Sequence, residues 1–136
     1  MELYHFTDSR NLLSIKKLGL LSWPILFECN IPSYMGSNQL SRNLDERKGF
    51  ERYVRLALQP RHRMLNYCLM DGRINQAIWL SIDDSILMQP GIFYSDTNAA
   101  ANRATIDNDP DTALNGDDQA EILIPERITA NYILNI

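Results

Sequence analysis

Short apolar segments bounded by turn-forming residues most constrain the fold of this chain. Segments rich in β-branched and aromatic residues predict strands. They are residues 2–7, 53–58, 77–82, 92–94, 119–124 and 131–136. Leucine and isoleucine residues at helical spacing predict one early helix, which Asp8 or Ser9 can cap and Gly19 can end. The pattern predicts an α+β fold with central, mixed, mostly antiparallel sheets and few helices, in a single domain over residues 1–136.

The remaining segments carry Pro, Gly, Asn and Asp and predict connections. Residues 20–40 are expected to be irregular, and residues 42–51 to form a short helix that ends near Gly49. Asp83 or Asp84 is expected to cap a helical turn that runs through residue 88. Residues 95–118 contain three consecutive alanines and then a polar run, which predicts a short helix followed by an exposed, mobile loop.

Composition places the chain among ordinary globular proteins. It has 136 residues, of which 45% are hydrophobic, enough to bury roughly two-thirds of the unfolded surface. Cys29 and Cys68 lie in apolar surroundings and are expected to be buried thiols in a reducing compartment. No apolar run approaches the about 20 residues of a membrane span, and the start resembles no signal peptide. We therefore expect a soluble cytoplasmic protein with no membrane partner.

The net charge of −4 conceals a strong segregation of charge. Between Arg42 and Arg63, seven cations face three acids, so the rest of the chain carries a large acidic excess. A basic segment in an acidic protein indicates a localised anionic ligand, such as a nucleotide or a piece of nucleic acid. The alternative is a solvated helix face whose cations pair with neighbouring acids.

Three residues are candidates for chemistry. Glu121 lies inside an apolar strand and must face solvent, a cleft or a partner, because burying a lone carboxylate is too costly. The alternative is an outward-facing acid in an edge strand. His5 can carry a proton or bond a ribose hydroxyl, or it can be an ordinary half-buried histidine. Arg42 can clamp a phosphate, or it can be a surface arginine paired with Asp45.

Other chemistries have weak support in the sequence. There is no glycine-rich phosphate-binding motif of the dinucleotide or Walker type. Two cysteines and two histidines give no zinc spacing, so no metal is expected. The run Arg61-His62-Arg63 can place a second histidine near phosphates, but no nucleophile elbow accompanies it.

Several motifs in order resemble the DarT-type ADP-ribosyltransferases, toxins that use NAD to modify bases in nucleic acid. That family opens with a His-x-Thr strand followed by an Asn-Leu-x-x-Ile-x-x-x-Gly-Leu helix. The matching residues are Leu3 to Asp8, Asn11-Leu12, Ile15, Gly19 to Ser22, Ser41-Arg42, Tyr53-Val54, Met64 and Ala120 to Pro125. The family's Tyr-Val-Pro-Phe-Tyr-Phe strand is Tyr53-Val-Arg-Leu-Ala-Leu58 here, and its Pro-Met-Leu is Arg63-Met64-Leu65. These departures leave DNA, RNA and protein open as acceptors.

The resemblance implies an ADP-ribosyltransferase-like fold, NAD as co-substrate and a single-stranded DNA or RNA acceptor. It implies that Glu121 stabilises the oxocarbenium-like ribose, and that Arg42 binds the pyrophosphate and helps to abstract a proton from the base. The cofactor-binding residues it implies are His5, Phe6, Thr7, Ser14, Ser22, Arg42 and Tyr53. Residues 97–118 would recognise the acceptor, and a cognate antitoxin is expected. On this basis Arg42 should matter more for activity than Arg52 or Arg55.

Two other functions remain open from the sequence. One is a related enzyme that modifies protein or only hydrolyses NAD, and the other is a degenerate, non-catalytic binding module. The presence of Glu121 together with His5 argues against degeneracy. The net acidity argues against broad nucleic-acid binding, which needs many cations, whereas a base-modifying enzyme needs only a small basic lip and a pocket for one base.

Overall fold

The computed structural model describes residues 1–35 and 39–136, with the side chains of 39–41 and 45 excepted. The side chains of Ser41 and Asp45, named above, therefore lie outside the described part. The strands are β1 (Glu2–Asp8), β2 (Leu20–Leu21), β3 (Tyr53–Ala57), β4 (Ala77–Asp83), β5 (Phe93–Ser95), β6 (Ile106–Asp107), β7 (Glu121–Pro125) and β8 (Arg127–Ile128). The α-helices are α1 (Leu12–Leu18), α2 (Trp23–Glu28), α3 (Gln39–Lys48), α4 (Arg63–Met70) and α5 (Pro110–Leu114). Short 3-10 helices cover Ser9–Asn11, Asp84–Met88 and Ala130–Tyr132.

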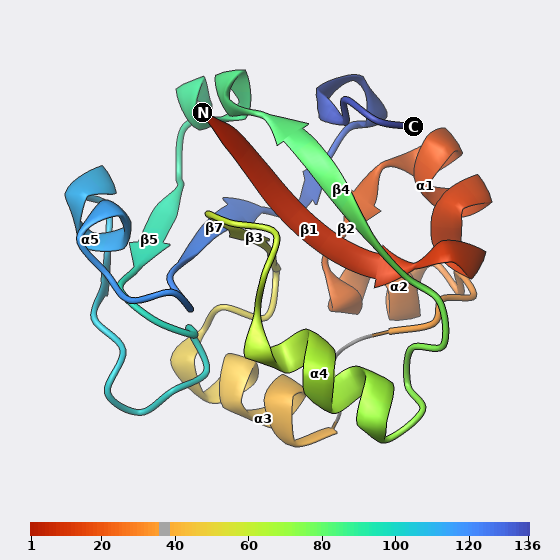
Figure 1. Ribbon diagram of the computed structural model, residues 1–136, viewed down its shortest axis with the longest axis horizontal. Helices are drawn as coiled ribbons and strands as arrows, with labels where there is room; N and C mark the ends of the chain where they lie inside the picture. Colours follow the sequence, from red (N-terminus) through yellow and green to blue (C-terminus); the bar gives the residue numbers. More distant parts are fainter. Residues whose placement is uncertain (36–38) are drawn as a thin grey trace.

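A six-stranded sheet in the order β4-β1-β3-β7-β5-β6 forms the centre of the molecule (Figure 1). A second sheet pairs β2 with β8. The named strands pair antiparallel throughout. The prediction of an α+β fold with antiparallel sheets and few helices is confirmed.

The central sheet splits between β1 and β3. β1 pairs with β4 along its whole length, from Glu2 opposite Asp83 to Asp8 opposite Ala77. With β3, the described register is the single pair Tyr4 and Ala57. The two strands therefore separate on the Thr7 side of this pair, and the gap can admit a ligand between them.

The core lies on the sheet face that Val54 and Leu56 share. Both side chains are buried, and they alternate with the half-buried Tyr53 and Arg55 on the other face, as a period of two requires. Leu3 from β1 and Ile122 from β7 are buried in the same cluster. The alternation fixes which residues of β3 face away from the core and can reach the gap.

The helix predicted after the first strand is confirmed, with its caps. The Asp8 side chain accepts a hydrogen bond from the Arg10 backbone N–H and so caps the 3-10 turn that leads into α1. Gly19 follows α1 with φ of +78°, and a Cβ there would lie 2.1 Å from the Ile128 carbonyl oxygen. Glycine therefore both ends the helix and allows the close approach of β8.

The expectation of irregular structure over residues 20–40 is wrong in part, because β2 and α2 lie there. Pro24 lies in the first turn of α2, where its missing N–H costs nothing, so this proline does not prevent a helix. No helix was predicted from the sequence where α4 lies. Cys29 is exposed, contrary to expectation, whereas Cys68 is buried in α4 as expected.

The C-terminal half contains two further corrections. The alanines at 99–101 form a turn rather than a helix, and Ala99 and Ala113 are buried. The helix of this region is α5, which Asp109 caps and Pro110 begins. The strand expected at 131–136 is absent among the described residues, where only an isolated bridge joins Ile133 to Ile82. Tertiary contacts outweighed local pattern in both places.

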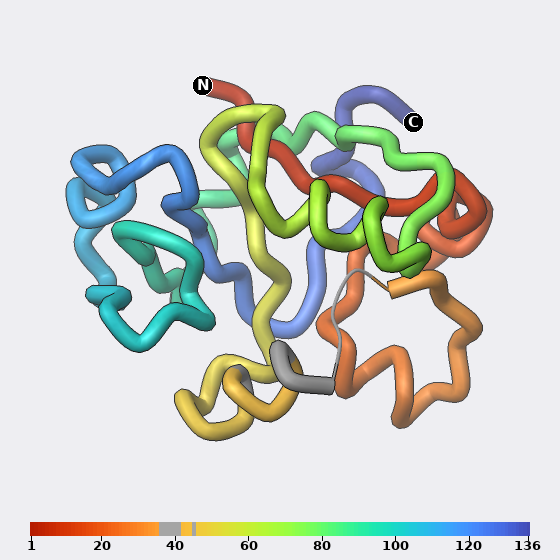
Figure 2. The backbone as a smooth tube through the Cα atoms, turned by 60° about the horizontal axis from the view of Figure 1, so that its bottom comes forward, coloured from red at the N-terminus to blue at the C-terminus, as the bar shows by residue number. Residues whose placement is uncertain are grey.

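Residues 96–118 and 22–35 lie on opposite sides of β3, as Figure 2 shows, with α3 near the lower end of that strand. No described helix has the length and apolar character needed to cross a membrane. A ligand in the gap between β1 and β3 would therefore have residues 96–118 on one side of β3 and residues 22–35 on the other.

Candidate active site

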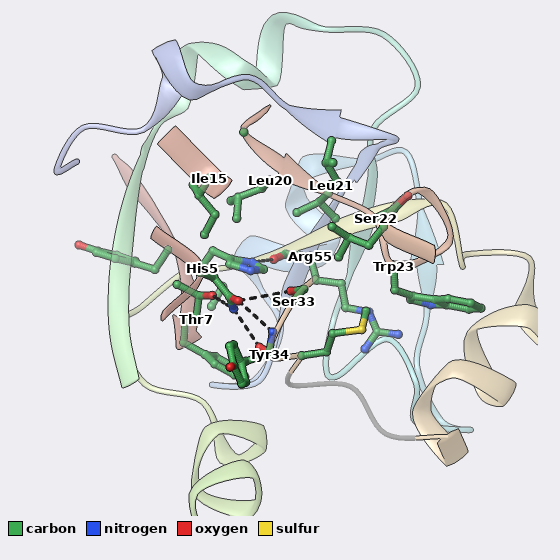
Figure 3. Close-up of a pocket in the computed structure, with 18 of the residues that line it drawn as sticks. His5, Thr7, Ile15, Leu20, Leu21, Ser22, Trp23, Ser33, Tyr34 and Arg55 are labelled. Carbon is green, nitrogen blue, oxygen red and sulfur yellow. Dashed lines mark hydrogen bonds between the residues drawn. The ribbon is translucent and has the colours of Figure 1, made fainter. Parts of the chain in front are cut away.

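A cavity of about 210 Å³ occupies the split between β1 and β3 (Figure 3). The residues that line the cavity come from both faces of the sheet, as Val54 and Arg55 of β3 illustrate. The predicted site residues that line it are His5, Phe6, Thr7, Ser14, Ser22, Tyr53 and Glu121. These residues are far apart in sequence, so the tertiary structure brings seven of the eight predicted side chains to one cavity.

Glu121 begins β7 and is almost completely buried, with 6% of its surface exposed. β7 lies between β3 and β5, so the alternative of an outward-facing acid in an edge strand is wrong. Its Oε1 accepts a hydrogen bond of 2.7 Å from the Ala99 backbone N–H. The Arg55 Nη1 lies 3.7 Å from Oε1, and the His62 Nε2 lies 3.5 Å from Oε2. This surrounding of donors offsets the cost of burying the carboxylate.

His5 bridges the two strands where they separate. Its Nδ1 lies 2.9 Å from the Arg55 carbonyl oxygen, and a carbonyl only accepts, so Nδ1 carries the proton. Burial lowers the pKa of His5, while the Arg55 carbonyl and the charge of Glu121 act in the opposite direction. In the neutral ring Nε2 is then an acceptor, suited to a hydroxyl donor.

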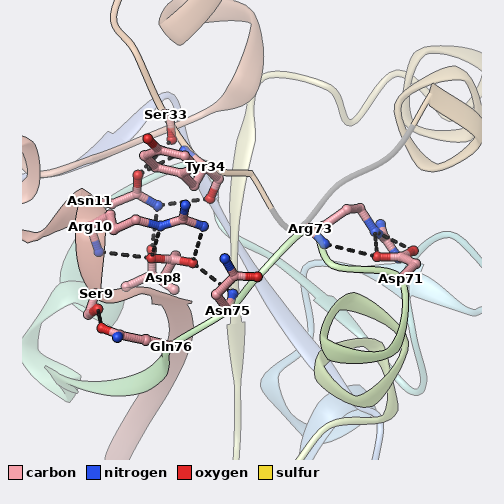
Figure 4. A network of polar contacts seen from close by, with 11 residues as sticks. Asp8, Ser9, Arg10, Asn11, Ser33, Tyr34, Asp71, Arg73, Asn75 and Gln76 are labelled. Carbon is pink, nitrogen blue, oxygen red and sulfur yellow. Dashed lines mark hydrogen bonds and ion pairs between the residues drawn. The ribbon is translucent and has the colours of Figure 1, made fainter.

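A polar network holds Ser33 and Tyr34 against the end of β1, next to the cavity (Figure 4). The Asn11 amide donates to Thr7 Oγ1 and to the Tyr34 carbonyl, and its oxygen accepts from the Tyr34 N–H. Arg10 lies over the Tyr34 ring, with Cζ 3.6 Å from the centroid, and forms a two-point ion pair with the buried Asp8. The Arg10 guanidinium holds the pKa of the Asp8 carboxyl well below its usual range. The network fixes one wall of the cavity.

Two buried donors at the start of α2 lack a hydrogen-bond partner among the described residues. Ser22 Oγ and Trp23 Nε1 have no hydrogen-bond partner among the described residues, and both residues line the cavity. Buried polar atoms are rarely left without a partner, so these atoms indicate a binding position. The sequence predicted Ser22 but missed Trp23, and its only signal was a tryptophan beside the Gly-Leu-Leu-Ser motif.

Arg42 is not among the described residues that line the cavity. Its guanidinium lies over the Phe27 ring of α2, with Cζ 5.5 Å from the ring centroid. The cation beside Glu121 is Arg55, which nothing in the sequence distinguished from the other members of the basic segment. Arg52 is partly exposed and forms ion pairs with Glu28 and Glu126. The cations of the basic segment therefore have different surroundings, and Arg55 is the one that faces the Glu121 carboxylate.

The turn before β6 joins the site to helix α3. Lys48, in the last turn of α3, donates through Nζ to the carbonyls of Ala99 and Ala101, at 2.9 Å in the first case. The N–H of the same Ala99 bonds Glu121, and Asn98 Oδ1 lies 3.5 Å from Arg55 Nη1. The first part of the predicted recognition loop thus lies at Glu121. Its acidic part forms β6 and α5, beside β5.

Comparison with solved structures defines the class of the fold. The chain resembles Thermosipho africanus DarTG in complex with ADP-ribose, with a TM-score of 0.79, 22% identity, and coverage of 97% of this chain and 42% of that one. It resembles Thermus sp. 2.9 DarT in complex with carba-NAD⁺, with a TM-score of 0.66, 16% identity, and coverage of 97% and 79%. The structure of that DarT with ADP-ribosylated ssDNA gives the same TM-score and identity. The fold is that of DarT ADP-ribosyltransferases, as the resemblance implied.

A family model described as DarT, ssDNA thymidine ADP-ribosyltransferase, matches residues 4–118. The chain therefore belongs to the DarT family, which confirms the family that the sequence motifs indicated. The match ends before Glu121, so the family assignment does not depend on that residue. Comparison with curated proteins gives no match. The chain spans less than half of the Thermosipho chain that it resembles.

Proposed function

We propose that this chain transfers ADP-ribose from NAD to a thymidine base in single-stranded DNA. The observation that carries the proposal is the buried Glu121 carboxylate, held by donors at the wall of a cavity between two separated strands. The choice of thymidine in single-stranded DNA as acceptor follows the description of the matching family. Residues 1–136 would act as one domain, in the cytoplasm where NAD and nucleic acid are present, and a cognate antitoxin would control a toxic activity.

NAD would lie in the cavity with its ribose between β1 and the start of α2. The Nε2 of neutral His5 would accept from a ribose hydroxyl, and the unpartnered Ser22 and Trp23 donors would bond polar atoms of the cofactor. Phe6, Thr7, Ser14 and Tyr53 would complete the wall around it. Arg42 would reach the pyrophosphate from α3, since its guanidinium lies against α2, whose first residues line the same cavity.

The reaction breaks the bond between nicotinamide nitrogen and ribose C1′, and nicotinamide leaves as a neutral molecule. The ribose then carries an oxocarbenium-like charge, as in glycoside hydrolysis. The Glu121 carboxylate would stabilise this charge, while a base nitrogen attacks C1′ and releases its proton. The proton of the base would pass to water, and the Arg42 guanidinium, which stays protonated, would assist its loss through its positive charge. No metal has a step in this proposal.

The acceptor base would approach Glu121 from the side of Asn98. The Asn98 side chain lies at the turn that bonds Glu121, and an amide can both donate to and accept from a base edge. The acidic residues between Asp107 and Asp118 would repel phosphates and so direct the DNA backbone away from α5. The cations of the segment from Arg42 to Arg63 would attract it on the other side.

The test uses NAD labelled in its ADP-ribose part and the purified chain. Four acceptors are offered. Three are oligonucleotides of matched length: a DNA that contains thymidine, a DNA in which every thymidine is replaced, and the RNA that corresponds to the first. The fourth is a protein mixture. Label on the first DNA alone is expected. Label on RNA or protein would assign a different acceptor, and release of nicotinamide without a labelled acceptor would define an NAD glycohydrolase. Absence of every reaction would refute the proposal.

A further inference from the structure

His62 is a buried histidine to which the reaction above gives no role. It precedes α4 and lies in the extended conformation of a helix N-cap, with φ of −151° and ψ of 137°. Its side chain is 3% exposed, and the ring lines the same cavity as Glu121. The neighbouring Arg63 side chain is 65% exposed. Of these two residues of the Arg61-His62-Arg63 run, His62 is therefore the one that points inward.

One hydrogen bond of the His62 ring fixes the position of its proton. Nδ1 accepts from the Met64 backbone N–H at 3.2 Å, so the lone pair of Nδ1 is in use. The neutral ring must then carry its proton on Nε2. That atom is buried, has no hydrogen-bond partner within the usual distance among the described residues, and lies 3.5 Å from Glu121 Oε2.

The two oxygens of Glu121 depend on different donors. Oε1 has the Ala99 N–H at 2.7 Å and the Arg55 guanidinium at 3.7 Å. On the Oε2 side the structure places His62 Nε2. The start of α4 is also fixed to this strand, because the Arg63 N–H donates to Gln119 Oε1 at 2.9 Å, two residues before Glu121. The ring thus has a defined position relative to the carboxylate.

We propose that His62 is a positioning residue for the transfer reaction: its Nε2–H, oriented by the helix cap at Nδ1, lies against Oε2 of Glu121 and so restrains the carboxylate plane against the ribose. The inference rests on the proposed function of Glu121. Without this donor the carboxylate can rotate about its last bond, and a displacement of about 1 Å at a reacting group can cost about 10²-fold in rate. NAD binding, which uses other side chains, is unaffected.

Two substitutions separate this role from the helix cap. In His62→Asn the amide oxygen takes the place of Nδ1 and caps α4, but no atom replaces Nε2. In His62→Gln the amide N–H takes the place of Nε2, and the cap is lost. We expect His62→Asn to lower kcat about 10²-fold with an unchanged KM for NAD and an unchanged melting temperature. We expect His62→Gln to retain more activity than His62→Asn, with a lower melting temperature.

The measurements are kcat and KM for NAD on the thymidine oligonucleotide, with melting followed by circular dichroism. Full activity of His62→Asn, or a greater loss in His62→Gln, would overturn the inference, because the cap would then be the only role of the ring. Nitrogen-15 NMR of the labelled wild-type chain gives a readout free of turnover. A protonated Nε2 whose signal moves in Glu121→Gln is expected, and a protonated Nδ1 would overturn the inference. An inactive wild-type chain would refute the proposed function and leave this NMR test valid.

Discussion

Replacement of Glu121 by glutamine removes one charge with almost no change of volume. The carboxylate is 6% exposed, so water screens it little, and an effective dielectric constant of about 20 applies. A full charge about 4 Å from the ribose cation then contributes about 4 kcal/mol. At about 1.4 kcal/mol for each tenfold change in rate, we expect kcat to fall about 10³-fold. The Ala99 N–H can still donate to the amide oxygen, so the local structure should persist.

The assay is single-turnover transfer of labelled ADP-ribose to a thymidine oligonucleotide, beside calorimetric titration with NAD. The affinity for NAD should change little, because the charge acts on the transition state. The new amide places an N–H group opposite the His62 Nε2–H, which should lower the free energy of unfolding by about 1–3 kcal/mol. A folded Glu121→Gln chain that retains activity within a few-fold of the wild type would refute the role assigned to this carboxylate.

Three further changes test the surroundings of the site. Arg55→Met should lower kcat about tenfold or more, because the Arg55 guanidinium lies 3.7 Å from Glu121. Arg52→Met should leave transfer unchanged, since exposed ion pairs contribute at most about 1 kcal/mol to stability. Equal losses of kcat in the two variants would contradict this. Lys48→Met should lower kcat without weakening NAD binding in calorimetry, because it frees the turn that bonds Glu121, and Lys48→Arg should restore part of the rate. Burial lowers the pKa of His5, so the unfolded chain takes up its proton first as the pH falls below about 6.5; the free energy of unfolding in urea should decrease through that range, and His5→Asn should flatten the profile.

The strand segments and one helix were predictable because local pattern reports them directly. Alternation identified β1, β3, β4 and β7 to within about one or two residues at each end. The cap at Asp8 and the stop at Gly19 follow from backbone chemistry that needs no tertiary partner. The His-x-Thr strand and the glutamate strand led to the family for the same reason, since each is a contiguous motif.

Local pattern gave no correct account of α2 or of the 131–136 segment. Pro24 lies in the first turn of α2, because a helix supported by packing tolerates proline there. The terminal segment has strand-forming residues, but among the described residues its pairing with β4 is one isolated bridge at Ile133, and the Asn135 side chain bonds the Ser81 N–H and the Trp79 carbonyl. Whether such residues pair depends on which sheet edge they meet, and that is decided by the rest of the chain.

The sequence by itself identified the candidate side chains for chemistry, above all Glu121 and His5. Only the tertiary structure decided that β1 and β3 separate to form a cavity, and that Arg55 and His62 meet the carboxylate there. Alternation along a strand tells which residues share a face, but it does not tell which strands are neighbours or in what register. The surroundings of Glu121 come from three separate segments, and their meeting depends on the pairing of the whole sheet.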